Sequence, residues 1–156
     1  MEERKKGEGK ALPFEVKNGY TAMPNAVSDY YRKHPRFTGA TERLYLFLLR
    51  MYNDEKGYAY PSYKAIREYT KIGSDGTVNK SVESLEYLRL IRVKKVRSAN
   101  GYDSNRYYFI QPIEDYNEFI RIFGDDLPSK YRDIEADLDE GDSASDDDFE
   151  GLTTWL

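Results

Sequence analysis

The chain has 156 residues and a mass of 18.3 kDa, enough for one domain with tails but not for two full domains. It has no cysteine and a single histidine, which excludes thiol catalysis, disulfides and cysteine metal sites and nearly excludes histidine-based triads. No long apolar run occurs, and the first fifteen residues are mostly charged, so neither a membrane span nor a secretory leader is expected. We therefore expect a cytoplasmic protein without enzymatic activity, cofactor or bound metal.

Charge is distributed unevenly along the chain. Residues 125–156 contain twelve acidic and two basic residues, a net charge of −10, whereas residues 1–124 carry +6. A basic body with an acidic tail is typical of a polyanion-binding domain with a competing polyanion on the same chain. The alternative is a tail that only keeps the protein soluble. The expected organisation is a flexible basic arm over 1–19, a domain over 20–124 and a disordered acidic tail over 125–156.

Hydrophobic spacing predicts the first elements of this domain. Residues 20–23 are expected to be extended, and a short helix is expected to begin at Pro24, since proline suits a first helical position. A longer helix, capped by Thr38 or Thr41, is predicted to continue to about Tyr52, because its apolar residues recur at helical spacing. Apolar residues cover so much of its surface that it should be the central, most buried helix.

A short strand over 58–60 and a pair of helices follow. The first helix is predicted over 63–69, with Ser62 as its N-cap, and the second over 75–88. The second helix has an apolar stripe at three- and four-residue spacing, formed by Val78, Val82, Leu85 and Leu88. Two helices joined by a short turn that contains glycine are typical of a helix-turn-helix.

Two strands and a closing helix complete the predicted domain. Alternating apolar and basic residues predict a half-exposed strand over 90–97, with a bulge where two lysines interrupt the alternation. A polar loop joins it to a strand over 106–110, and a short helix is predicted over 115–123. This order of elements is that of a winged helix. The predicted fold class is α+β, mainly α: a winged helix-turn-helix with a two-stranded wing, a flexible N-terminal arm and an acidic C-terminal tail.

The segment from Pro61 to Ile91 carries a more specific pattern. It has Pro-Ser before the first helix of the pair, Thr-Val at the start of the second, and Leu-x-x-Leu before an apolar strand. These residues are Pro61, Ser62, Thr77, Val78, Leu85, Leu88, Leu90 and Ile91. The pattern resembles the winged-helix domain of replication initiators of Gram-positive plasmids and phages, and of related primosome-loading proteins. The resemblance covers about residues 20–112 and implies sequence-specific binding of double-stranded DNA in replication initiation.

One residue departs from that pattern. Arg89 stands where the family usually has a glycine that ends the helix in the left-handed conformation. Arginine in that conformation costs about 1 kcal/mol, so either the helix ends differently or a long cation is needed there. The pattern does not separate replication initiators from winged-helix transcriptional regulators. A third alternative is a protein-interaction module on the same scaffold.

The second helix of the pair supplies the candidate base contacts. A helix-turn-helix places the first part of this helix in the DNA major groove, where threonine, asparagine and lysine side chains can contact base edges. The candidates are Ser74, Gly76, Thr77, Asn79 and Lys80. At the start of the first helix, Ser62, Tyr63 and Lys64 are candidates for phosphate contact. The alternatives are solvated residues at a helix start and, for the second group, simple capping.

The predicted wing is strongly basic. From Arg89 to Arg106 there are six cations and one acidic residue. A basic hairpin with a polar tip suits contact with phosphate or the minor groove, although a solvated sheet face is the alternative. The candidates are Lys94, Lys95, Arg97, Asn100, Tyr102 and Arg106. Tyr102 could stack on a base, whereas most of the fifteen tyrosines are expected to fill a half-buried core.

The end of the acidic tail also contains large apolar residues, namely Phe149, Leu152, Trp155 and Leu156. Acidic segments with spaced aromatic residues often dock into a groove of a partner and fold as they bind. Docking onto the protein's own basic surface and the absence of any role are the alternatives. The candidate partners are double-stranded DNA, a replication or transcription protein bound through these four residues, and a second copy of the chain in a homodimer. No membrane partner is expected.

Overall fold

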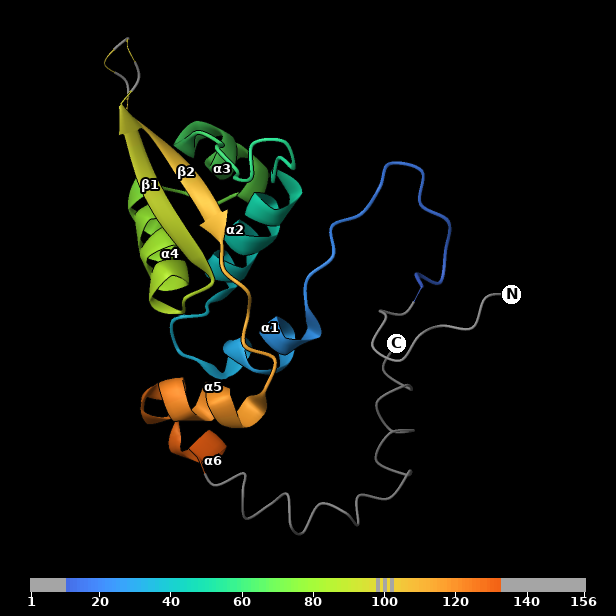
Figure 1. Ribbon diagram of the computed structural model, residues 1–156, viewed down its shortest axis with the longest axis vertical. Helices are drawn as coiled ribbons and strands as arrows, with labels where there is room; N and C mark the ends of the chain where they lie inside the picture. The colour runs from blue at the N-terminus through green and yellow to red at the C-terminus, as the bar shows by residue number, and fades with distance from the viewer. Residues whose placement is uncertain (1–10, 98, 100, 102, 133–156) are drawn as a thin grey trace.

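Figure 1 shows the computed structural model, which describes residues 11–97, 99, 101 and 103–132. These residues form an α+β structure that is mainly helical and has a two-stranded antiparallel sheet. None of the helices in these ranges is long and apolar enough to cross a membrane. The elements in chain order are α1 (Asn25–Asp29), η1 (Tyr31–Lys33), α2 (Gly39–Arg50), α3 (Tyr63–Thr70), α4 (Asp75–Tyr87), β1 (Ile91–Arg97), β2 (Asp103–Phe109), α5 (Tyr116–Phe123), η2 (Gly124–Asp126) and α6 (Ser129–Arg132).

Helix α2 is the central helix, as its composition predicts, and it packs against both α3 and α4. Thr38 is its N-cap, because the Oγ1 atom of Thr38 accepts a hydrogen bond from the backbone N–H of Thr41 at 3.2 Å. Its inward face buries Leu44 and Leu48 completely. Tyr45 is almost fully buried on the same helix, and this burial raises the pKa of its hydroxyl to about 12.

Helix α4 ends in the left-handed conformation that usually requires glycine. Arg89 has φ of 57°, its N–H donates to the carbonyl of Glu86, and the N–H of Leu90 donates to the carbonyl of Leu85, both at 3.0 Å. This pair of hydrogen bonds is the Schellman motif, and the apolar contact that accompanies it is supplied by the fully buried Leu85 and Leu90. The helix therefore ends as it would with glycine, and the strain of about 1 kcal/mol is present at Arg89.

Strands β1 and β2 form a regular hairpin. Every residue of β1 has a partner in β2, from Ile91 opposite Phe109 to Arg97 opposite Asp103, so the predicted bulge is absent. The two consecutive lysines simply point to opposite faces, and β2 begins three residues earlier than predicted because the ladder extends further toward the tip. The predicted strand over 58–60 is reduced to single bridges, of which one pairs Ala59 with Tyr107. Residues 20–23 form no strand.

The last helices close the opposite end of the molecule from the hairpin tip, as Figure 1 shows. The hydroxyl of Tyr31 accepts a hydrogen bond from the backbone N–H of Ile113 at 2.9 Å, and its ring lies 5.0 Å from that of Phe119. The chain continues past Gly124 through η2 and α6, and Leu127 is only 1% exposed in the same core. Residues 125–132 are therefore part of the folded body, although their composition assigned them to the tail.

Candidate nucleic-acid interface

Two serines are the N-caps of helices α3 and α4. The Oγ atom of Ser62 accepts a hydrogen bond from the N–H of Ala65 at 3.1 Å at the start of α3. The Oγ atom of Ser74 accepts from the N–H of Thr77 at 3.2 Å at the start of α4. Both hydroxyls therefore satisfy free backbone donors of their helices, which is a structural role independent of any ligand.

The turn between α3 and α4 is fixed by side chains from both sides. Arg67 donates to the carbonyl of Gly73 at 3.1 Å and to the carboxylate of Asp75 at 3.4 Å. Lys71 ends α3 in the left-handed conformation with φ of 63°, and Ile72 is buried beneath the turn. These contacts hold the start of α4 in one orientation relative to α3 while leaving its outer side uncovered.

The first turns of α4 expose most of the predicted base contacts. Val78, Val82 and Leu85 point into the core, which confirms the predicted apolar stripe. On the other side, the exposed residues of these turns are Asp75, Gly76, Thr77, Asn79 and Lys80. A methyl group at Gly76 would have its nearest neighbour at 3.9 Å, so packing within the described chain does not require glycine there. The lack of a side chain leaves the backbone open to close approach from outside.

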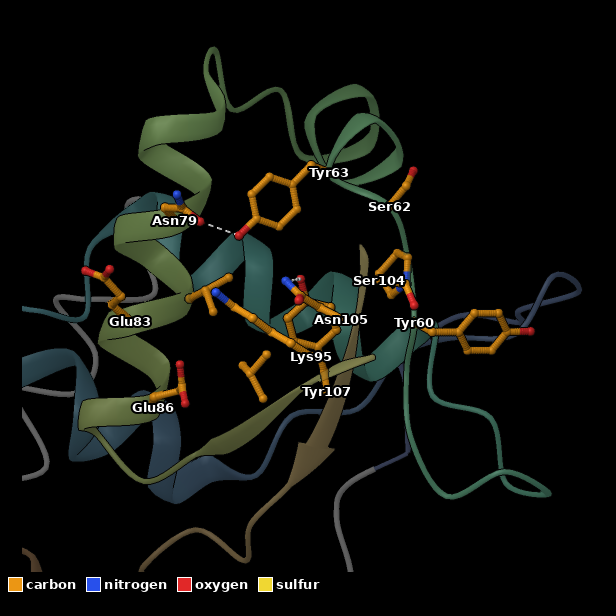
Figure 2. A pocket seen from close by; sticks show the side chains of 13 residues that line it. Tyr60, Ser62, Tyr63, Asn79, Glu83, Glu86, Lys95, Ser104, Asn105 and Tyr107 are labelled. Atoms are coloured by element: carbon orange, nitrogen blue, oxygen red, sulfur yellow. Dashed lines mark hydrogen bonds between the residues drawn. The ribbon is translucent and has the colours of Figure 1, made fainter. Parts of the chain in front are cut away.

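A groove of about 650 Å³ separates α4 from the hairpin, and α3 forms its upper end (Figure 2). The hydroxyl of Tyr63 donates a hydrogen bond to the amide oxygen of Asn79 across this groove. On the hairpin side, the Nδ2 atom of Asn105 donates to the hydroxyl of Tyr107 at 3.3 Å. The groove therefore contains polar groups from three elements, and Tyr63 fixes the orientation of the predicted base-contacting amide of Asn79.

The wall of this groove formed by α4 is acidic. Glu83 and Glu86 line it, and Lys95 faces it from β1. Burial is the main cause that raises the pKa of Tyr63, and the negative charges of Asp75, Glu83 and Glu86 raise it further. Burial also raises the pKa of Tyr107 to about 12. Both phenols therefore stay protonated at neutral pH; the hydroxyl of Tyr63 donates to Asn79, whereas that of Tyr107 accepts from Asn105.

The basic surplus lies in the hairpin rather than in the helix pair. Residues 63–87 contain four basic and four acidic residues, so this unit is neutral. The hairpin's cations are divided between its two faces by strand alternation. Lys95 and Arg97 share the face toward α4. Lys94 and Arg106 lie on the opposite face, at directly opposing positions of the two strands. The sequence suggested one basic patch, and the structure separates it into two.

The structure thus brings Ser62, Tyr63, Asn79 and Lys95 to one groove and places Lys64 and Lys80 on the exposed surface beside it. Asn100 and Tyr102 lie outside the described residues. Sequence reasoning missed the contribution of Glu86, Asn105 and Tyr107 to the groove. Alternation along β2 was the signal for the last two, since residues 105 and 107 share the face that turns toward α4.

The chain matches no family model, no curated protein and no solved structure. No group of three or more side chains that could hold a metal ion occurs within the part of the chain that the structure describes. The geometry of this surface and the pattern between Pro61 and Ile91 are therefore the features that indicate a function for the chain.

Proposed function

We propose that the chain is a non-enzymatic winged-helix protein that binds specific sequences of double-stranded DNA and acts in replication initiation of a plasmid or phage. The observation that carries the proposal is the exposed start of α4, where Thr77, Asn79 and Lys80 lie beside a cationic hairpin. The element order and the pattern that resembles the replication initiators support the same assignment.

In the proposed complex, the first turns of α4 enter the major groove. An α-helix with its side chains is about 10–12 Å wide, which fits a major groove of about 12 Å. Thr77, Asn79 and Lys80 then reach base edges, and Lys95 and Arg97 contact the adjacent backbone. Glu83 cannot face a phosphate without repulsion, so it faces a base edge, where a carboxylate accepts from the amino group of cytosine.

The test is selection of bound duplexes from a random pool by the full chain, followed by titration of the selected and a scrambled duplex at several salt concentrations. Contact with about 4–6 phosphates gives a slope of roughly −4 to −5 in the plot of log affinity against log salt concentration. Repeated sites in the selected sequences would favour replication initiation over transcriptional regulation. Absence of binding at about 50 mM salt, or a flat salt dependence, would reject the proposal.

The neutral charge of residues 63–87 favours one alternative, a protein-interaction module. In that case the groove with Tyr63, Glu83 and Glu86 binds a polypeptide instead of a base edge. The same titration separates the two, because a protein-binding module would show neither a selected sequence nor a steep salt dependence.

A further inference from the structure

The face of the sheet turned away from α4 contains a cluster of tyrosines and cations. The buried Ala59 pairs with Tyr107. The residues on either side of this pair therefore project from the opposite face of the sheet. By the same alternation, Arg92 and Lys94 of β1 lie on this face, opposite Tyr108 and Arg106 of β2. We call the part of this surface nearest the Ala59 bridge the outer face; its residues are Tyr58, Tyr60, Arg92, Lys94, Arg106 and Tyr108.

The aromatic rings of the outer face lie close together and next to cations. The ring centroids of Tyr58 and Tyr108 are 5.4 Å apart, and those of Tyr58 and Tyr60 are 5.9 Å apart. The guanidinium of Arg106 lies 4.7 Å from the ring centroid of Tyr58, and the ammonium of Lys56 lies 4.4 Å from that of Tyr60. The three tyrosines thus form a contiguous aromatic surface with positive charge at its edges.

Core packing does not account for these rings. The hydrophobic core and the residues packed against it include Tyr107 and Phe109 of β2, whereas Tyr58, Tyr60 and Tyr108 are not among them. Tyr60 is 49% exposed, Tyr58 and Tyr108 are half-buried, and Arg92 and Lys94 are exposed beside the rings. None of the six residues of the outer face is acidic. An aromatic surface with cations around it complements a ligand that is both flat and negatively charged.

We propose that the outer face binds single-stranded nucleic acid, with bases stacked on Tyr60 and Tyr108 and phosphates held by Arg92, Lys94 and Arg106. Exposed aromatic rings and flanking cations are the features by which proteins bind single strands without sequence preference. In a duplex the faces of the bases are covered by their neighbours, so this surface selects unpaired strands. The inference does not depend on duplex binding, because five of the six residues of the outer face lie away from the groove beside α4, and only Tyr60 also borders it.

The test uses the full chain and a fluorescently labelled deoxythymidine oligomer of about fifteen nucleotides at about 25 mM salt, with anisotropy as the readout. The loss of one stacking ring should weaken binding between about fivefold and about hundredfold. We expect this loss for Tyr60→Leu and for Tyr108→Leu. The matched controls are Tyr20→Leu, which removes an exposed tyrosine elsewhere, and Asn79→Ala, which alters the proposed duplex surface; both should bind the oligomer like the wild type.

A second ligand separates stacking from charge. An abasic strand of the same length keeps every phosphate but has no base to stack on either ring, so the wild type should bind it more weakly by at least the factor expected for the loss of one ring. Arg92→Gln and Lys94→Gln, both at exposed positions, should each make the salt dependence shallower by about 0.7 in slope. A labelled oligouridine of the same length, titrated in the same way, tests whether the surface distinguishes RNA from DNA.

Two results would overturn the inference. One is equal affinity for the abasic strand and the oligomer, or an oligomer affinity that both tyrosine substitutions leave unchanged. The other is failure of the full chain to bind the oligomer while it still binds a selected duplex. The second result would point to another occupant of the outer face, such as the acidic tail, and would leave the proposed duplex binding intact.

Discussion

The imidazole of His34 donates a hydrogen bond from Nε2 to the carboxylate of Asp126, 3.0 Å away. Its other nitrogen, Nδ1, accepts from the backbone N–H of Arg36 at 3.1 Å, which places the proton of the neutral ring on Nε2. The hydroxyl of Tyr87 donates to the same carboxylate oxygen of Asp126. Asp126 therefore joins η2 to the end of α4 and to the segment before α2, although the sequence assigned it to the acidic tail.

The first prediction concerns the acid stability of this contact. Hydrogen bonds from Tyr87 and then His34 lower the pKa of Asp126, so the folded protein favours the ionised carboxylate. The stabilisation is complete above the ordinary aspartate range and is lost as the pH falls through the lowered pKa. We expect Asp126→Asn to lower the melting temperature modestly at neutral pH, with the difference from wild type shrinking between about pH 5 and about pH 2.

Thermal unfolding followed by circular dichroism across that pH range measures the effect. Asp54→Asn, which changes an exposed carboxylate outside this contact, is the matched control. Melting curves of wild type and Asp126→Asn that stay a constant distance apart would show that the carboxylate makes no pH-dependent contribution to the free energy of unfolding.

The sequence predicted the helices well because their signals are local. The stripe of Val78, Val82 and Leu85 fixes which side of α4 is buried, and Thr38 and Ser62 mark the starts of α2 and α3. Each of these features depends only on residues a few positions apart along the chain. The interior of the helical part was therefore predictable without any knowledge of the tertiary contacts.

The remaining features depend on contacts between distant segments. Residues 58–60 contribute to the sheet through the Ala59 bridge, so the pairing that brings Tyr58 next to Tyr108 has no local signal. The segment after Gly124 has an acidic composition typical of a disordered tail, but Leu127 is buried in the core. Because charged residues surround Leu127 in the sequence, this single apolar residue did not predict a folded segment. In the structure, the burial of Leu127 anchors the segment.

The second prediction concerns the close approach of DNA to α4. Gly76 is exposed and has room for a methyl group, so Gly76→Ala should stabilise the fold by about 0.5–1 kcal/mol through its better helix propensity. If the backbone at Gly76 contacts the duplex, the same substitution should weaken specific binding. A more stable variant with lower affinity is a combination that misfolding cannot produce. Unchanged affinity would show that DNA does not approach the helix at this residue.

The third prediction separates base contacts from backbone contacts. Asn79→Ala and Lys80→Ala should cost about 1–3 kcal/mol on the selected duplex and should reduce the ratio of specific to random-sequence affinity. Arg97→Ala should weaken binding to all duplexes and make the salt slope shallower by about one unit. All three residues are exposed, so the melting temperature should change little. A specificity ratio that falls only for Arg97→Ala would mean that the hairpin, not α4, recognises the sequence.

The fourth prediction concerns the helix end at Arg89. Arg89→Gly removes the strain of the left-handed conformation and should raise the free energy of unfolding by up to about 1 kcal/mol. The greater conformational entropy of glycine in the unfolded chain reduces this gain. Chemical denaturation measures this change. Arg89→Lys keeps both the charge and the strain and is the matched control. If Arg89→Gly is more stable yet binds duplex more weakly than Arg89→Lys, a cation at this position contributes to DNA binding.

The fifth prediction concerns removal of the acidic tail. The contacts of Asp126 and Leu127 show that the truncation must begin after Arg132 instead of after Gly124. Removal of all residues after Gly124 would delete the buried Leu127 and the carboxylate of Asp126, so such a truncation would destabilise the body itself. Residues 133–156 still contain ten acidic and no basic residues. A chain that ends at Arg132 therefore loses a net charge of −10 and keeps the contacts of η2.

We expect this shorter chain to bind random-sequence duplex several-fold more tightly than the full chain at low salt. The removed segment can compete with phosphates for the basic hairpin, and competition between exposed charges is screened as salt is added. The difference should therefore fade toward about 0.3 M salt. A matched control keeps the full length but replaces Asp146, Asp147 and Asp148 by asparagine, which should produce part of the gain. Equal binding of all three chains at low salt would mean that the tail does not compete with DNA, and its apolar residues would then favour a separate protein partner.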